Sequence, residues 1–331
     1  MVGSLEDHFK EDDLASGGLS DISCTISDIE KACLQLSSSS AAGPDGVPAV
    51  LRKTCRKQLC LPLYHLWRGS LNCGTIPAET LLVIICPVHK GGFRSLPKQY
   101  RPVALTSHLI KTFERVMRKA LVDHIEQTDL LPDGQHGSRS RRSTLTQLLS
   151  HWDNIIEGLE KGDGVDCVYL DFSKAFDKCD HGILLHKIKR LKIKGRLGRW
   201  LQNFLTERQQ VVLVNKVKSK YSSLVSGIPQ GSVPGPILFL IYVSDIGQDL
   251  IANTLVYVDD TKVKQKVTSE SDVEDLQKEL IKLDNWAKVN NMEFNKGKFI
   301  VLRYGENEAL KNETEYFSGE YDEIIETSEE T

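Results

Sequence analysis

The fold is decided by the stretch Thr254-Leu-Val-Tyr-Val-Asp-Asp-Thr-Lys-Val-Lys-Gln-Lys-Val267. It contains two runs of β-forming residues, 254–258 and 261–267, and only Asp259 and Asp260 separate them, which predicts a tight antiparallel hairpin. Two-residue turns usually contain Asn-Gly, Asp-Gly or Gly-Gly, because these residues tolerate a positive φ. Adjacent carboxylates repel each other, and a bound cation would offset that repulsion. Because Asp pairs also occur in exposed turns, the pair alone fits either a solvated turn or a metal site.

A second predicted strand ends in another carboxylate. Gly164-Val-Asp-Cys-Val-Tyr-Leu-Asp171 is rich in β-forming residues, and a helix is expected after it at residues 182–193. Carboxylates from two different strands can form an oxygen-lined cup for a hard cation such as Mg2+, which also takes oxygens from substrate phosphates. Two such ions could activate a nucleophile and stabilise a leaving pyrophosphate. Asp171 therefore favours the metal-site interpretation of the hairpin.

Two further segments carry local signals. Ser271-Asp-Val-Glu274 fits a capping box, and apolar residues then recur every three or four positions up to Ala287, which predicts a helix packed on a sheet. Between the acids lies Ser226-Gly-Ile-Pro-Gln-Gly-Ser-Val-Pro-Gly-Pro236, which is too rich in Gly and Pro for an element interior. This stretch fits a substrate-facing loop that enters a helix, or a simple strand-to-helix connection.

Composition narrows the class of protein. The 331 residues are 40% hydrophobic and 26% charged, which excludes a wholly disordered, collagen-like or coiled-coil chain. The chain shows neither a membrane-spanning run nor a signal peptide, so we expect an intracellular protein, cytoplasmic or nuclear, without membrane contact. Its eight cysteines form no Cys-x-x-Cys pair, so no zinc ribbon or redox motif is indicated. Residues 31–305 carry 40 bases and 27 acids between acidic ends, a balance typical of polyanion-binding domains and also of many solvated enzyme surfaces.

Six sequence blocks in a fixed order, followed by a seventh, resemble the reverse transcriptases of non-LTR (LINE-type) retrotransposons. The set covers about residues 25–305, and its order is far more specific than any single block. The blocks are Ala42-Gly-Pro-Asp-Gly-Val-Pro48, Tyr100-Arg-Pro-Val103 with Lys111-Thr-Phe-Glu114, Gln135-His-Gly-Ser-Arg139 with Arg142-Ser-Thr144, Tyr169-Leu-Asp-Phe-Ser-Lys-Ala-Phe-Asp177, Gly227-Ile-Pro-Gln-Gly-Ser-Val233, Tyr257-Val-Asp-Asp260 and Phe294-Asn-Lys-Gly-Lys298.

This resemblance implies an α+β fold, a right-hand polymerase with fingers and palm subdomains whose antiparallel palm sheet is backed by helices. The expected organisation is an acidic, Ser-rich N-terminal segment (1–40), fingers (41–160), palm (161–305) and an acidic, disordered tail (306–331). Full elements of this family also carry an upstream endonuclease and a thumb after the palm. Neither fits in this chain, so we expect the thumb to be missing and a separate endonuclease or thumb-containing chain to be a partner.

The resemblance also assigns the chemistry. Asp171 and Asp259 would be the direct ligands of two Mg2+ ions, for which Mn2+ could substitute, and Asp260 would be the third catalytic carboxylate with a lesser coordinating role. The reaction would be attack of a DNA primer's 3'-hydroxyl on the α-phosphate of a deoxynucleoside triphosphate (dNTP), directed by an RNA template. Lys298 matches a lysine that could protonate pyrophosphate as a general acid or support the site.

Other residues match positions that meet the substrates. Phe176, five residues beyond Asp171, matches the bulky residue that excludes a ribose 2'-hydroxyl, although a Phe is also commonly a core residue. Gln230 resembles the glutamine that meets the incoming dNTP, and both Lys90 and Arg101 match finger residues that grip its triphosphate. The expected contacts to template or primer phosphates are Arg139, Arg141 and Arg142, for which surface solvation is the competing interpretation.

Some residues depart from the family's pattern or lie outside it. The family commonly has Leu where Pro234 stands, and a proline is tolerable there only within the first turn of a helix. Val258 replaces the usual Ala and gives Tyr-Val-Asp-Asp, a sequence also found in retroviral enzymes, so activity is not excluded. We expect His181 to pack or hydrogen-bond rather than to shuttle protons.

Two other interpretations remain open. A catalytically inactive or co-opted remnant would keep the basic groove and bind nucleic acid without extending primers. A group II intron-type maturase would share the palm, but it would append a helical intron-binding domain that this sequence lacks. The complete set of carboxylates favours the active polymerase, and the missing thumb favours poor activity.

Overall fold

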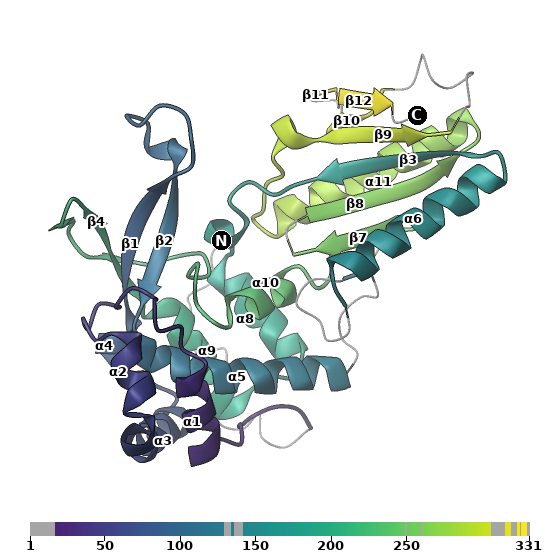
Figure 1. Cartoon of the computed structure of the whole chain (residues 1–331). Helices are drawn as coiled ribbons and strands as arrows, with labels where there is room; N and C mark the ends of the chain where they lie inside the picture. The colour runs from purple at the N-terminus through teal and green to yellow at the C-terminus, as the bar shows by residue number, and fades with distance from the viewer. Residues whose placement is uncertain are drawn as a thin grey trace. The chain divides into compact units, whose positions relative to one another are not determined.

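The computed structural model describes residues 17–128, 134–135, 142–248, 250–258, 260–305, 315–318, 323–324 and 326–329. The chain divides into two compact units, each built from separate stretches. Unit 1 combines Met1–Thr128 with Cys179–Ile241, and unit 2 combines Asp129–Lys178 with Tyr242–Thr331. Each unit contains helices and a largely antiparallel sheet, which confirms the α+β class (Figure 1). The assignment of fingers and palm and the missing thumb stay predictions.

Unit 1 is mainly helical, with one sheet in the order β2-β1-β4-β5 and β6 paired to β4. The strands β1 and β2 form an antiparallel hairpin, and β1 also pairs with β4 in parallel. The elements are α1 (Ile26–Leu34), α2 (Ala49–Thr54), α3 (Arg56–Cys73), α4 (Ala78–Leu81), β1 (Leu82–His89), η2 (Pro97–Gln99), β2 (Tyr100–Thr106), α5 (His108–Gln127), α8 (His181–Arg190), α9 (Gly195–Thr206), β4 (Gln209–Val214), β5 (Val217–Lys218), β6 (Ser222–Ser223) and α10 (Gly235–Tyr242), whose last residue begins the second stretch of unit 2.

A row of aromatic rings holds the helices of unit 1 together. Trp67 of α3 stacks on Phe113 of α5, Phe113 meets Trp200 of α9 edge-on, and all three are fully buried. Each buried indole N–H has an acceptor, because Trp67 donates to Thr112 Oγ1 and Trp200 donates to Ser70 Oγ. These contacts fix α5 in the centre of the unit, where its buried face supports the loops described below.

Unit 2 is a five-stranded sheet in the order β12-β9-β3-β8-β7 with a helix on each face. On one face, Ile155 of α6 packs with Val165 and Cys167 of β3 and Tyr304 of β9. On the other, Gln265 of β8 donates to a carbonyl of α11. The elements are α6 (Thr144–Glu160), β3 (Gly164–Leu170), α7 (Ala175–Lys178), β7 (Asn253–Tyr257), β8 (Asp260–Val267), α11 (Glu270–Val289), η3 (Lys296–Lys298), β9 (Ile300–Tyr304), β10 (Phe317–Ser318), β11 (Glu323–Ile324) and β12 (Glu326–Glu329).

Helix α11 confirms the predicted amphipathic helix but begins earlier than expected. Its cap is Ser269 rather than Ser271, and the Ser269 N–H donates to the Asp272 carboxylate at 2.9 Å. The capping box therefore lies two residues before the predicted one, because Thr268 and Ser269 both donate to Asp272 and fix the first turn there. The predicted apolar face is buried through Leu276, Leu283 and Ala287 among others.

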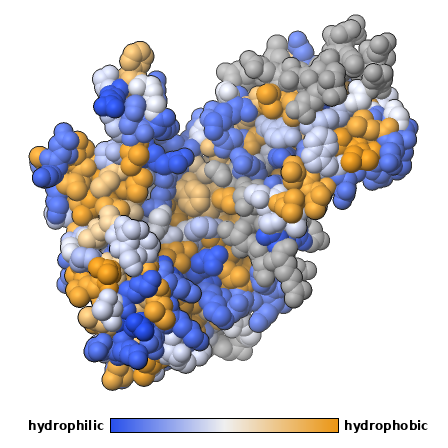
Figure 2. All heavy atoms as spheres, in the orientation of Figure 1, coloured by the Kyte–Doolittle hydropathy of each residue, from blue (hydrophilic) through white to orange (hydrophobic). Residues whose placement is uncertain are grey.

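Helix α6 buries only a narrow face against the sheet. An adjacent face of the helix exposes large apolar side chains, which appear as orange patches along this helix in Figure 2. They are Leu145, Leu148, Leu149, Trp152, Ile156 and Leu159. Among the described helices of either unit, none has the length and hydropathy to span a lipid bilayer.

Candidate active site

Asp171 stands directly after β3, which is buried along most of its length. The loop at residues 293–295 holds the chain at this point, because the Asn295 N–H donates to the Asp171 carbonyl at 2.7 Å. The next ring, Phe172, is buried and stacks on Phe294 with centroids 4.5 Å apart. Since the backbone on both sides of its Cα is fixed, the Asp171 carboxylate has a defined position at the end of the strand.

Asp260 lies at the same end of the neighbouring strand. The antiparallel register of β3 and β8 pairs Leu170 with Thr261, so one further step sets Asp171 opposite Asp260. Asp260 is exposed and Asp171 only partly so. Asp259, the other predicted metal ligand, lies outside the described residues. The sheet thus brings two of the three predicted carboxylates to one edge.

The hairpin turn is one residue earlier than predicted. Tyr257 pairs with Asp260, so Asp260 begins β8 instead of lying in the turn as predicted, and Val258 lies in the turn. Val258 has φ +59°, a left-handed conformation that is uncommon and unfavourable for a β-branched residue. The shift arises because β8 begins at Asp260 to complete its pairing with β7, and this places the strain on the valine.

The Asp171 carboxylate has a cation beside it in unit 2. The ammonium of Lys298, which extends from η3, forms an ion pair with Asp171 Oδ2, and the Lys298 side chain is mostly exposed. Within the described ranges no group of three His, Cys, Asp or Glu side chains converges on one point. The oxygens of Asp171 and Asp260 suit a hard cation in kind, and the ammonium shows that a positive charge is accommodated at Asp171.

Phe176 is held near this edge by an unusual backbone conformation. It lies in the short helix α7, and Lys174 just before that helix has φ +51°, which turns the chain sharply after Asp171. At the end of α7, Lys178 forms an ion pair with Glu293. Phe176 is only half-buried, unlike the core ring of Phe172. The competing interpretation as a core residue therefore fits poorly.

Gln230 occupies a tight turn in unit 1. The Ser232 N–H donates to the Pro229 carbonyl at 3.0 Å, so Gln230 and Gly231 are the two central residues of a β-turn. Gly231 has φ +98°, and a Cβ there would lie 3.1 Å from the Ala104 carbonyl of β2. Pro234 directly precedes α10, and its carbonyl accepts the Leu238 N–H. The proline therefore lies at the helix start, where a proline is tolerated.

Lys90 and Arg101 lie on the β1–β2 hairpin of the same unit. Arg101 of β2 pairs with Val88, and the Lys90 N–H donates to the Gln99 carbonyl, so the two basic residues are diagonal neighbours. By the alternation of side chains along strands they share one face of the hairpin, and both are exposed. The hairpin thus presents two cations, as an anion-binding surface requires.

The three predicted phosphate-binding arginines are only partly described. Arg142 is half-buried and stands immediately before Ser143, whose hydroxyl caps α6 by accepting the Thr146 N–H. Arg139 and Arg141 lie outside the described residues. Arg142 is therefore fixed at the start of α6 in unit 2.

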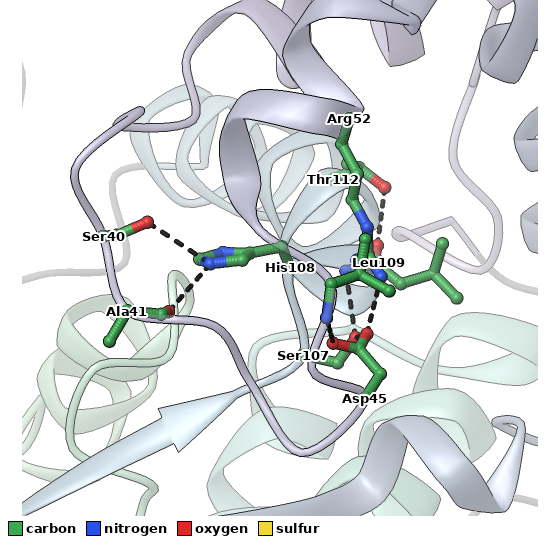
Figure 3. A network of polar contacts seen from close by, with 9 residues as sticks. Ser40, Ala41, Asp45, Arg52, Ser107, His108, Leu109 and Thr112 are labelled. Atoms are coloured by element: carbon green, nitrogen blue, oxygen red, sulfur yellow. Dashed lines mark hydrogen bonds and ion pairs between the residues drawn. The ribbon is translucent and has the colours of Figure 1, made fainter.

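A polar network that the sequence did not predict anchors the Gly-Pro-Asp-Gly block (Figure 3). The Asp45 carboxylate accepts hydrogen bonds from Arg52 and from the Ser107 hydroxyl, both at 2.6 Å, and His108 Nε2 contacts the Ala41 carbonyl. Burial would raise the pKa of Asp45, but the hydrogen bonds from Ser107 and Arg52 outweigh it and lower the pKa. The sequence signal was the place of Asp45 in the Ala42–Pro48 block, and its partner Ser107 could not be predicted because it is distant in the chain.

The chain is similar to known proteins over most of its length. A family model described as reverse transcriptase (RNA-dependent DNA polymerase) matches residues 88–316. The chain is 29% identical over 222 residues to the probable RNA-directed DNA polymerase from transposon BS of Drosophila melanogaster, covering 67% of this chain and 24% of that protein. It is 27% identical over 278 residues to the corresponding protein from transposon X-element of the same species, covering 82% and 30%.

A third relative is the RNA-directed DNA polymerase from mobile element jockey of Drosophila funebris. The identity is 29% over 287 residues, covering 83% of this chain and 31% of that protein. The chain therefore spans about a quarter to a third of the length of these curated relatives.

Proposed function

Because the chain belongs to the reverse transcriptase (RNA-dependent DNA polymerase) family, we propose that it is the polymerase core of a non-LTR retrotransposon, which copies an RNA template into DNA. The observation that carries the proposal is the register of β3 and β8, which pairs Leu170 with Thr261 and so puts the next residues, Asp171 and Asp260, at the same end of adjacent antiparallel strands. The ion pair of Asp171 with Lys298 supports it, since this carboxylate already faces a cation.

The acids would hold the cation that the reaction needs. Asp171 and Asp259 would bind Mg2+ directly, and Asp260 would take a lesser coordinating role. Bound Mg2+, as two ions, would supply the positive charge that activates a hydroxyl nucleophile and neutralises a phosphoryl leaving group. Oxygen-only ligands suit this hard ion and would also accept Mn2+.

The substrates are a DNA primer on an RNA template and dNTPs. The primer's 3'-oxygen attacks the α-phosphate, the bond to the β-phosphate breaks, and pyrophosphate leaves. The ammonium of Lys298 pairs with Asp171 and so lies beside a proposed metal ligand. It could donate a proton to the leaving pyrophosphate. The half-buried ring of Phe176 would close the space needed by a ribose 2'-hydroxyl.

The cations and amide of unit 1 would bind the dNTP. Lys90 and Arg101 share a face of the β1–β2 hairpin and would grip the triphosphate, Arg101 through its planar fork. Gln230, at the corner of its turn, would contact the incoming nucleotide. Arg142, together with Arg139 and Arg141, would bind template or primer phosphates without reading their sequence.

The test is primer extension by the purified chain on an RNA template, with Mg2+ and then with Mn2+. Asp171→Asn should abolish extension, whereas Asp123→Asn, an exposed acid on α5, should extend like the parent. Extension that survives Asp171→Asn would refute the site. If no chain extends and the primed template still binds, the protein is a nucleic-acid-binding remnant rather than a polymerase.

A further inference from the structure

Glu114 of α5 is a carboxylate buried in the interior of unit 1, and its side chain is fully inaccessible to solvent. Burial of a carboxylate without partners is strongly unfavourable, so the groups that contact Glu114 indicate why it is buried there. Its Oε2 accepts the Val233 N–H at 2.9 Å, and its Oε1 lies 3.6 Å from Nη2 of Arg208. Val233 closes the Gly-Ile-Pro-Gln-Gly-Ser-Val stretch, so this acid holds one end of the turn that carries Gln230.

Arg208 stands behind Glu114 and is equally buried. It lies between α9 and β4, donates from Nε to the Phe204 carbonyl at 2.8 Å, and places its guanidinium 4.0 Å from the centre of the Phe204 ring. Among the described residues its Nη1 and Nη2 have no hydrogen-bond partner. Burial lowers the pKa of Arg208 to about 10, and Glu114 opposes that shift, so the guanidinium stays charged at neutral pH.

The other end of the turn is held from α8. The Gly227 N–H donates to the Cys179 carbonyl at 2.7 Å, and His181 Nε2 donates to the Gly227 carbonyl at 2.8 Å. Because a carbonyl only accepts, the hydrogen of the neutral ring is on Nε2. This contact confirms the expectation that His181 forms a hydrogen bond, and the expectation that it does not shuttle protons stays a prediction. Two side chains from distant helices thus fix both ends of the seven-residue stretch.

We infer that Glu114, with Arg208 behind it, is a positioning residue that holds the Gln230 turn in the conformation that receives the nucleotide. The inference rests on the proposed role of Gln230. The acid touches no substrate and acts through one hydrogen bond to the Val233 main chain. Misplacing a contact by a fraction of an ångström weakens binding of the group it meets and leaves other substrates unaffected.

Two double variants separate the hydrogen bond from the ion pair. Both remove the two buried charges together, since a buried pair replaced by groups of similar volume usually leaves the fold stable. Glu114→Leu/Arg208→Met has no acceptor for Val233. Glu114→Gln/Arg208→Met keeps an amide oxygen that can accept it. Thr112→Val is the matched control, because Thr112 is buried on the same helix and bonds Trp67 rather than the loop.

The first readout is steady-state primer extension with dNTP varied. We expect the Leu/Met variant to raise the KM for dNTP about tenfold, because a displaced Gln230 would lose a nucleotide contact of about 1.4 kcal/mol. The Kd for the primed template should not change. The Gln/Met variant and Thr112→Val should stay within about twofold of the parent. Equal KM in the Leu/Met and Gln/Met variants would overturn the inference.

The second readout does not depend on activity. Hydrogen–deuterium exchange of residues 226–234 should accelerate in the Leu/Met variant and remain slow in the Gln/Met variant and in Thr112→Val. Unchanged exchange in the Leu/Met variant would refute the claim that Glu114 holds the Gln230 turn, even in a chain that extends no primer. Faster exchange with an unchanged dNTP KM in an active chain would refute the role of Gln230 instead.

Discussion

Asp171 and Phe176 illustrate how single residues take their roles from backbone geometry. Asp171 directly follows a buried strand, and its carbonyl accepts the Asn295 N–H, so its backbone is held at the end of the strand. Phe176 follows a left-handed Lys174 and remains half-buried. The sequence pattern located both residues, because strand ends and motif spacing are local properties. Glu114 and Asp45 stand in matched blocks, but the pattern gave them no role, because their partners lie far along the chain.

Phe176 should act as the barrier to ribonucleotides. Phe176→Ala opens the space that the ring fills, so the ratio of ribonucleotide to deoxynucleotide incorporation should rise at least about tenfold, or about 1.4 kcal/mol of lost discrimination. Single-nucleotide insertion with matched rNTP and dNTP measures this ratio. Phe93→Ala, an exposed ring beyond β1, is the control. An unchanged ratio in Phe176→Ala would assign the ring to packing alone.

Lys298 should matter for rate and little for stability. An ion pair with a mostly exposed lysine contributes at most about 1 kcal/mol, so Lys298→Ala should shift the unfolding midpoint only slightly. If the lysine donates a proton to pyrophosphate, kcat should fall about 100-fold. Lys296→Ala tests the neighbouring exposed lysine of η3 and should be near normal. A large loss of stability with normal kcat would show a purely structural role.

At the scale of elements, the sheet and helices of unit 2 show which boundaries the sequence predicted and which it did not. Three strands of this sheet, β3, β7 and β8, and the helix α11 were predicted from β-forming runs and from helical periodicity, whereas β9 and β12 were not predicted. The turn was wrong by one residue and the cap by two, because cross-strand pairing of Tyr257 and side-chain bonds to Asp272 decide those boundaries. Local propensity does not decide which of two nearby, chemically similar residues, such as Ser269 and Ser271, ends a strand or caps a helix.

Asp45 should make the stability of unit 1 depend on acid pH. Its folded pKa is below the ordinary 3.8, so its contribution is present above about pH 4 and is lost as pH falls through the folded pKa. Asp45→Asn should therefore be less stable than the parent near pH 6, by about 1–3 kcal/mol, and the difference should shrink toward pH 3. Urea unfolding across pH, with Asp123→Asn as control, measures it. A difference independent of pH would exclude the carboxylate's charge as the cause.

At the scale of the whole molecule, the chain enters unit 2 after Thr128, returns to unit 1 at Cys179, and enters unit 2 again at Tyr242. The described acids Asp171 and Asp260 lie in unit 2, and Lys90, Arg101 and Gln230 lie in unit 1. This division follows from topology rather than composition, so no local pattern predicted it. The ordered motifs identified the candidate site residues, whereas the residues that hold them in place, such as Glu114, were found only in the structure.

Binding of a primed template should depend on salt and not on sequence. Replacing Arg139, Arg141 and Arg142 together by Gln should reduce the slope of log affinity against log salt by about 0.7 to 0.9 for each phosphate that the protein no longer neutralises. Fluorescence anisotropy with two unrelated template sequences at several salt concentrations measures both properties. A weakening confined to one sequence, or an unaltered slope, would argue against phosphate binding by these arginines.

The central claim is that the acids of the β7–β8 hairpin and of β3 catalyse DNA synthesis. The most direct measurement compares primer extension and primed-RNA affinity of Asp259→Asn with those of the parent chain. Removing a metal ligand while keeping every phosphate-binding side chain should abolish synthesis and leave RNA affinity within about twofold. Synthesis by Asp259→Asn at the parent's rate would contradict the account.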